Sequence, residues 1–193
     1  ELIPERLMSE YRARYRTIYD RADLYVPFFE RCLVSLEPGG ILGFICADRW
    51  MKNKYGGPLR AMVAKEYRLI SYIDMVGTPA FQTEVSAYPA ITIIKKDIPG
   101  PTRVAHQPEI DRENLEKLAT AITADVIPEG SGIIEVSDIV RGREPWILKS
   151  FDQVSVARRI EQDFPLIEDA SCKVGIGVAT GADKIFIGPF EKL

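Results

Sequence analysis

PGGILGFICADRW, residues 38–50, is the stretch that decides the fold. An apolar run from Ile41 to Cys46 follows Gly39-Gly40 without polar alternation, and Asp48-Arg49-Trp50 comes directly after it. Such a run is typical of a strand that is buried on both faces, at the centre of a parallel sheet. Ligands of open α/β sheets bind at the carboxyl ends of the strands. We therefore expect functional side chains at residues 48–50.

Composition limits the class of protein. The chain has 193 residues, of which 46% are hydrophobic, and this is enough for one domain of ordinary size or one domain with part of another. No stretch is long and apolar enough to cross a membrane, so the expected compartment is the cytoplasm. The net charge of −3 argues against a free-standing module that binds nucleic acid through a basic face. The first residue is not Met, and we expect an excised fragment.

The residues around the central strand predict alternating helices and strands. Residues 23–36 read as a helix with Asp23 as N-cap, residues 51–57 as a polar loop, and residues 58–67 as a helix with Pro58 at its start. Strands are predicted at 69–76 and 90–96. Only about ten residues separate these two strands, so they should pair antiparallel. The expected fold class is α/β, a parallel sheet with an antiparallel final hairpin, plus a smaller α+β segment.

The second half of the chain has a different pattern. It predicts a helix at 111–124, a strand at 133–140, a helix at 151–164 and a strand, glycine-rich turn and strand at 172–187. Residues 97–103 carry two prolines and a glycine and read as the exit from the first domain. GIGVATG, residues 175–181, departs from a dinucleotide-binding fingerprint in both spacing and context, so a β-turn is the better interpretation. We expect three parts, at 1–98, 99–165 and 166–193.

Residue types exclude several chemistries. His106 is the single histidine, no Walker motif is present, and no His, Cys and carboxylate cluster has metal-ligand spacing, so no metal is expected. Cys32, Cys46 and Cys172 form no CxxC pair and read as reduced packing residues. Arginines and tyrosines alternate in residues 1–21, a pattern that fits a solvated helix face better than a nucleic-acid grip.

Two ordered blocks carry a resemblance to a known family. The first is residues 23–60, DLYVPFFERCLVSLEPGGILGFICADRWMKNKYGGPLR, and the second is residues 81–96, FQTEVSAYPAITIIKK. Their order and spacing resemble the catalytic domain of N6-adenine-specific DNA methyltransferases of restriction-modification systems, the TaqI-like and type IIG group. The resemblance covers about residues 1–98. Residues 174–187 look like the opening of the same family's target-recognition domain.

The resemblance implies a methyl transfer from S-adenosylmethionine to N6 of a flipped adenine in double-stranded DNA, with a fused or separate restriction endonuclease as partner. The family's Asn-Pro-Pro-Tyr motif and cofactor glycine loop lie upstream of the matched region, and no NPPY or DPPY occurs in this chain. We therefore expect no catalytic residue in the fragment and no turnover by it alone. The second half of the methyltransferase sheet is what the fragment should contain.

Site residues follow by position from the same resemblance. Phe81 matches the aromatic residue that stacks on the flipped base. Phe28 matches the residue that packs on the adenine ring of S-adenosylmethionine. Asp23 is the second residue predicted to bind this cofactor. The DNA-contact candidates are Arg49, Lys52, Asn53, Lys54, Tyr55 and Thr180. Two alternatives stay open: an RNA or protein methyltransferase on the same sheet, and a non-catalytic DNA-binding or scaffold segment in which these side chains only pack.

Overall fold

The computed structural model describes residues 5–81, 88–137 and 139–148, and beyond these residues 156, 159–160, 162–170, 172–173 and 175. The chain divides into two compact units, Glu1–Val154 and Ser155–Leu193. The first unit contains the sheet. In the second, a short 3₁₀ helix, η2, spans Ile167–Ala170. Most of the predicted helix at 151–164 and strands at 172–187 lie outside the described residues.

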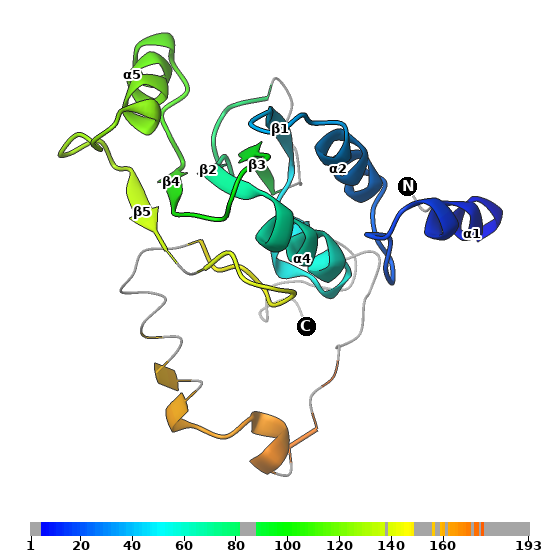
Figure 1. The fold of residues 1–193 in the computed structure, drawn as a ribbon. Coiled ribbons are helices and arrows are strands. Elements are labelled where there is room, and N and C mark those ends of the chain that lie inside the picture. The colour runs from blue at the N-terminus through cyan, green and yellow to red at the C-terminus, as the bar shows by residue number, and fades with distance from the viewer. Residues whose placement is uncertain are drawn as a thin grey trace, which may run out of the picture. The chain divides into compact units, whose positions relative to one another are not determined.

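One mixed sheet organises the first unit (Figure 1). Its strands, in the order in which they pair, are β1 (Ile41–Ala47), β3 (Pro89–Lys95), β2 (Arg68–Asp74), β4 (Thr102–His106) and β5 (Ile134–Val136). β3 runs antiparallel to both β1 and β2, so β1 and β2 run in the same direction with a reversed strand between them. β4 is parallel to β2, and β5 is antiparallel to β4. The predicted antiparallel hairpin of the last two strands, β2 and β3, is confirmed.

The position of β1 corrects one expectation. β1 stands at the end of the strand order rather than at its centre, and it pairs with β3 alone among the described strands. One of its faces is open, because the side chains of Ile41 and Ile45 are 59% and 54% exposed. The prediction of burial on both faces is therefore wrong for the described residues. The apolar run sets a strand but does not reveal which neighbours cover it.

The helices agree with the sequence periodicity in most places. α2 (Tyr25–Val34), α4 (Gly57–Glu66) and α5 (Arg112–Thr123) confirm three predicted helices, and α1 (Glu5–Arg14) precedes them. The predicted loop at 51–57 is wrong, since this region forms α3 (Arg49–Lys52) and the 3₁₀ turn η1 (Lys54–Gly56). The turn packs closely on α3: a Cβ at Gly56 would lie 1.8 Å from the carbonyl oxygen of Trp50.

Aromatic side chains fill the core between the sheet and the helices α2 and α4. The Phe29 ring lies with its centroid 4.5 Å from that of Phe44 on β1 and 5.2 Å from that of Trp50. Trp146, which follows β5, packs edge-on against Trp50 at 5.5 Å. Its backbone N–H donates to the carbonyl of Met51 at 2.9 Å. Residues after β5 thus belong to the same core as β1.

α5 packs on the other face of the sheet. A second buried cluster joins Ile73 of β2 and Ala105 of β4 to Leu118 and Ile122 of α5. The segment at 97–103, predicted to leave the domain, instead leads directly into β4 of the same sheet. The three-part division at residues 98 and 165 stays a prediction.

Candidate active-site edge

The carboxyl ends of β1 and β2 meet at a buried carboxylate. Asp48 follows β1 and is 2% exposed. It accepts a hydrogen bond from the Tyr72 hydroxyl of β2 at 2.9 Å and forms an ion pair with Lys52 Nζ at 2.5 Å. Burial raises the pKa of the Tyr72 hydroxyl well above its ordinary value, and the nearby charge of Asp48 adds to this. Tyr72 therefore remains a donor at neutral pH and ties β1 to β2.

The end of β1 also contacts the residue at which the loop carrying Phe81 returns to the sheet. The backbone N–H of Asp48 donates to the carbonyl of Tyr88 at 2.9 Å, directly before β3. The guanidinium carbon of Arg49 lies 5.3 Å from the centre of the Tyr88 ring, within the range of a cation–π contact. Phe81, on the outgoing side of the loop, is 42% exposed. The Phe81 side chain is thus accessible to a ligand at this edge.

The start of α2 brings a second group of side chains to the end of β1. The hydroxyls of Tyr25 and Tyr55 lie 2.7 Å apart. Burial raises the pKa of the Cys46 thiol to about 12, and the charges of Asp48 and Asp23 contribute, so both carboxylates lie near the sulfur. The residues around 23–25, 46–48 and 55 therefore form one polar cluster at this edge.

The two predicted cofactor residues both lie on α2 or at its start, and both are accessible. Phe28 is 60% exposed although its neighbour Phe29 is fully buried, so α2 presents one aromatic ring outward. Asp23 is also exposed. Its predicted role as N-cap is wrong: Leu24 occupies that position, and Asp23 Oδ1 accepts a hydrogen bond only from the Leu24 N–H, at 2.7 Å. The carboxylate is therefore not used to cap the helix.

The predicted DNA-contact residues lie together on α3 and η1. Arg49, Lys52, Asn53 and Lys54 are exposed, and Tyr55 is half-buried. Two of the cations already have protein partners, because Lys52 pairs with Asp48 and Arg49 lies over Tyr88. Thr180 lies outside the described residues. The roles proposed for these side chains stay predictions.

Arg60 supports this edge, and the sequence patterns did not reveal it. The side chain is 2% exposed, and its Nη1 donates to the carbonyls of Trp50 at 2.5 Å and Asn53 at 2.9 Å. Its Nε and Nη2 donate to the carbonyl of Arg143 at 2.9 and 2.6 Å. Burial lowers the pKa of the guanidinium. The sequence signal that could have revealed this residue is an arginine within the buried face of α4, beside Leu59 and Val63.

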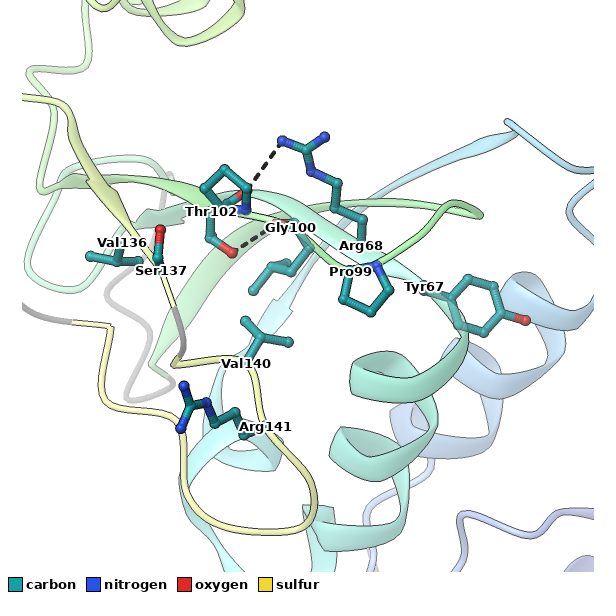
Figure 2. A pocket seen from close by; sticks show the side chains of 11 residues that line it. Tyr67, Arg68, Pro99, Gly100, Thr102, Val136, Ser137, Val140 and Arg141 are labelled. Carbon is teal, nitrogen blue, oxygen red and sulfur yellow. Dashed lines mark hydrogen bonds between the residues drawn. The ribbon is translucent and has the colours of Figure 1, made fainter.

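The cavity in Figure 2 lies at the opposite, amino-terminal ends of the strands. It measures about 280 Å³ and lies where β2 and β4 begin, and it is also lined by Val136, Ser137, Val140 and Arg141. Thr102 Oγ1 donates to the carbonyl of Leu69 at 2.8 Å, and Arg68 Nη2 lies 3.5 Å from the carbonyl of Pro101. Since Asp48 and Asp74 mark the other ends of the strands, this cavity is separate from the candidate site.

Metal sites and membrane spans are absent from the described part of the chain. No group of three or more His, Cys, Asp and Glu side chains among the described residues could hold a metal ion. None of the helices formed by these residues is long and apolar enough to span a membrane.

A reversed strand lies between two co-directional strands, with polar residues gathered at the carboxyl ends of those two strands and helices packed on the mixed sheet, so the predicted α/β fold class is confirmed. A solved structure, the modification subunit of a putative type I restriction enzyme from Vibrio vulnificus, shares this fold with a TM-score of 0.60 at 5% sequence identity. The alignment covers 81% of this chain and 37% of that chain.

The sequence relatives confirm the resemblance to restriction-modification methyltransferases. Residues 2–81 match the Eco57I restriction-modification methylase family. The whole chain aligns with the type II methyltransferase M.PaeR7I of Pseudomonas aeruginosa at 59% identity and with M.XhoI of Xanthomonas vasicola at 53%. The chain spans only 34% and 36% of the lengths of these two relatives. It is therefore homologous to about a third of a type II methyltransferase.

Proposed function

We propose that this chain is part of a site-specific DNA methyltransferase that transfers a methyl group from S-adenosylmethionine to N6 of an adenine flipped out of the duplex. The observation that carries the proposal is the 59% identity to a type II methyltransferase along the whole chain. The position of the polar cluster, at the carboxyl ends of β1 and β2, supports it, because ligands of such sheets bind there.

The cofactor side of the proposal rests on Asp23 and Phe28. An adenosine group needs an apolar surface for its ring and acceptors for its hydroxyl and amine hydrogens. The exposed ring of Phe28 and the exposed Asp23 carboxylate offer these two features at the start of α2. When bound, S-adenosylmethionine supplies an electrophilic methyl group. The residues of this chain bind and orient the cofactor and do not take part in the bond change.

The base side rests on Phe81. Flipping an adenine costs a few kcal/mol of stacking and pairing, and an aromatic face in the pocket offsets part of that cost. The Phe81 ring is exposed, and Tyr88 at the return of the same loop is anchored to the end of β1 through Asp48 and Arg49. We infer that this anchor positions the loop so that Phe81 stacks on the flipped base.

The exposed side chains on α3 and η1 are the proposed contacts to the DNA backbone. Lys54 and Asn53 are exposed beside the polar cluster and can donate hydrogen bonds to phosphate oxygens. Lys52 can do so only if its ion pair with Asp48 rearranges. A fused or separate endonuclease belongs to the same proposal, as the partner expected for a restriction-modification enzyme.

The test is Phe81→Ala in the full-length protein, measured as methyl transfer to unmethylated DNA. Base–aromatic stacking is worth about 1–3 kcal/mol, so kcat/KM should fall about 5- to 150-fold with unchanged thermal unfolding. Phe164→Ala is the matched control, because that ring is also exposed, at 65%, and has no proposed role. Equal activity of both variants would contradict the base-stacking role. Transfer to RNA or protein instead of DNA would favour the first alternative, and binding of DNA without any transfer would favour the second.

A further inference from the structure

A second charged surface lies along α4, on the side of this helix that carries Ala61 and Lys65. A groove of about 370 Å³ runs between α4 and the segment that follows α1. We call it the α4 groove. Its lining includes three positive side chains and one negative side chain, which are Arg16, Lys65, Arg143 and Glu66. The whole chain has a net charge of −3, so this excess of positive charge is a local feature.

The wall opposite α4 is held in place by a buried carboxylate. Glu30 of α2 accepts hydrogen bonds from the backbone N–H of Arg16 at 3.2 Å and from the backbone N–H and hydroxyl of Thr17 at 2.9 and 2.6 Å. Tyr19 follows two residues later, lines the groove and is 40% exposed. Both Arg16 and Tyr19 lie beyond the end of α1 at Arg14, so they are not part of the solvated face expected for that helix.

Arg143 enters the groove from the segment after β5. Its guanidinium carbon lies 5.8 Å from the centre of the Tyr19 ring. This contact uses the flat face of the guanidinium, so the N–H groups in its plane remain able to donate to an anion. Arg60 holds the backbone of the same residue by donating twice to the Arg143 carbonyl, at 2.9 and 2.6 Å. Arg143 is exposed, and no hydrogen bond or ion pair joins its side chain to another described residue.

The α4 groove begins beside the residues proposed to contact DNA. Lys54 lies in η1, and Gly57, the first residue of α4, follows η1 directly. A Cβ on Gly57 would lie 3.6 Å from Nε of Arg143, so this side chain lies next to the end of η1. Lys65 is exposed about two turns further along α4. Positive side chains therefore continue from η1 along the outer side of α4.

We propose that the α4 groove binds the DNA backbone next to the contacts proposed for α3 and η1, with the side chains of Arg143 and Lys65 donating to phosphate oxygens. Tyr19 is a positioning residue, because it holds the Arg143 guanidinium. Phosphate is the ligand class, since a guanidinium and an ammonium with available donors bind its oxygens whatever the base sequence. An acidic peptide would meet the same charges, but the continuity with η1 favours DNA. This inference rests on the proposed function, in which DNA is the substrate.

The salt dependence of DNA binding by the full-length protein tests the groove. Filter binding of a labelled unmethylated plasmid between about 50 and 200 mM salt gives the slope of log affinity against log salt, whose magnitude falls by about 0.9 for each lost phosphate contact. Arg143→Gln should lower this magnitude by about one and weaken binding about 5- to 10-fold at about 100 mM salt. Arg112→Gln on α5, whose side chain is 92% exposed, is the matched control and should change neither value. Equal slopes for the two variants would overturn the proposal.

Two further variants separate a DNA contact from a structural role. Lys65→Gln should also lower the magnitude of the slope by about one. It decides the matter if Arg143→Gln lowers the thermal unfolding midpoint, because no hydrogen bond or ion pair joins Lys65 to another described residue. Tyr19→Leu keeps both charges, so it should weaken binding and leave the slope unchanged. A wild-type slope for Lys65→Gln, or wild-type affinity for Tyr19→Leu, would overturn the role of that residue.

Methyl transfer by the wild-type protein is measured separately, so the two proposals can fail independently. Transfer to DNA together with equal salt slopes for all the variants would refute the groove alone. Binding that follows the predicted slopes, without any methyl transfer, would refute the proposed function alone.

Discussion

Replacing Arg60, which is not itself a proposed ligand contact, should loosen the edge that carries α3 and η1. Arg60→Met keeps the length of the side chain and removes four hydrogen bonds to three carbonyls. The carbonyl of Trp50 is buried, so leaving it unpaired costs about 1–3 kcal/mol, and the two half-buried carbonyls add to this cost. The expected loss is about 2–4 kcal/mol of unfolding free energy, which lowers the unfolding midpoint.

The assay is thermal unfolding of the full-length protein, together with hydrogen exchange over residues 49–56. Arg60→Lys should be intermediate, because an ammonium keeps the charge but cannot reach all three carbonyls with the planar fork of a guanidinium. Lys65→Met on the exposed side of α4 is the control for loss of a charge. Equal unfolding midpoints for Arg60→Met and Lys65→Met, together with equal exchange over residues 49–56, would refute the role assigned to Arg60.

Three further predictions concern other contacts. Cys46→Ala should reduce the loss of stability with rising pH between about pH 9 and 12. The folded protein keeps the thiol proton that the unfolded chain releases above pH 9, so the intact thiol costs about 1.4 kcal/mol of stability per pH unit. Urea unfolding as a function of pH measures this slope, and equal slopes for both proteins would contradict the prediction. Glu30→Ala removes the buried carboxylate that accepts hydrogen bonds from the backbone of Arg16 and from the backbone and hydroxyl of Thr17, so chemical denaturation should show a loss of about 2–4 kcal/mol. The 193-residue chain alone should transfer no methyl group to DNA, since it has no NPPY or DPPY motif, and a methylation assay giving turnover would disprove this.

The sequence predicted the helices and strands better than it predicted which of them lie side by side. Helical spacing and β-branched runs are local properties, which is why α2, α4, β2, β3 and α5 lie where the periodicity indicated. A short connection between two strands restricts them to antiparallel pairing, so the β2–β3 hairpin was also predictable. The order β1-β3-β2 was not, because it depends on which strand enters between two others.

The candidate site was predictable where it follows from strand ends and not where it follows from buried polar contacts. Asp48 lies at the end of the apolar run, so its place at the edge could be inferred from the sequence. Its hydrogen bond from Tyr72 joins residues 24 positions apart, and Arg60 reaches Arg143 across 83 positions. Such pairs leave no local pattern. The folding of residues 51–57 into helical turns depends similarly on the close approach of Gly56 to Trp50.

We expect the full-length protein to methylate adenine at N6. Incubation with unmethylated DNA and S-adenosylmethionine carrying a labelled methyl group, followed by digestion to nucleosides and mass spectrometry, tests it directly. We predict that label appears in N6-methyladenine alone, and that Phe81→Ala reduces it whereas Phe164→Ala leaves it unchanged. Label in a methylated cytosine, or no label in DNA from a folded full-length protein, would contradict it.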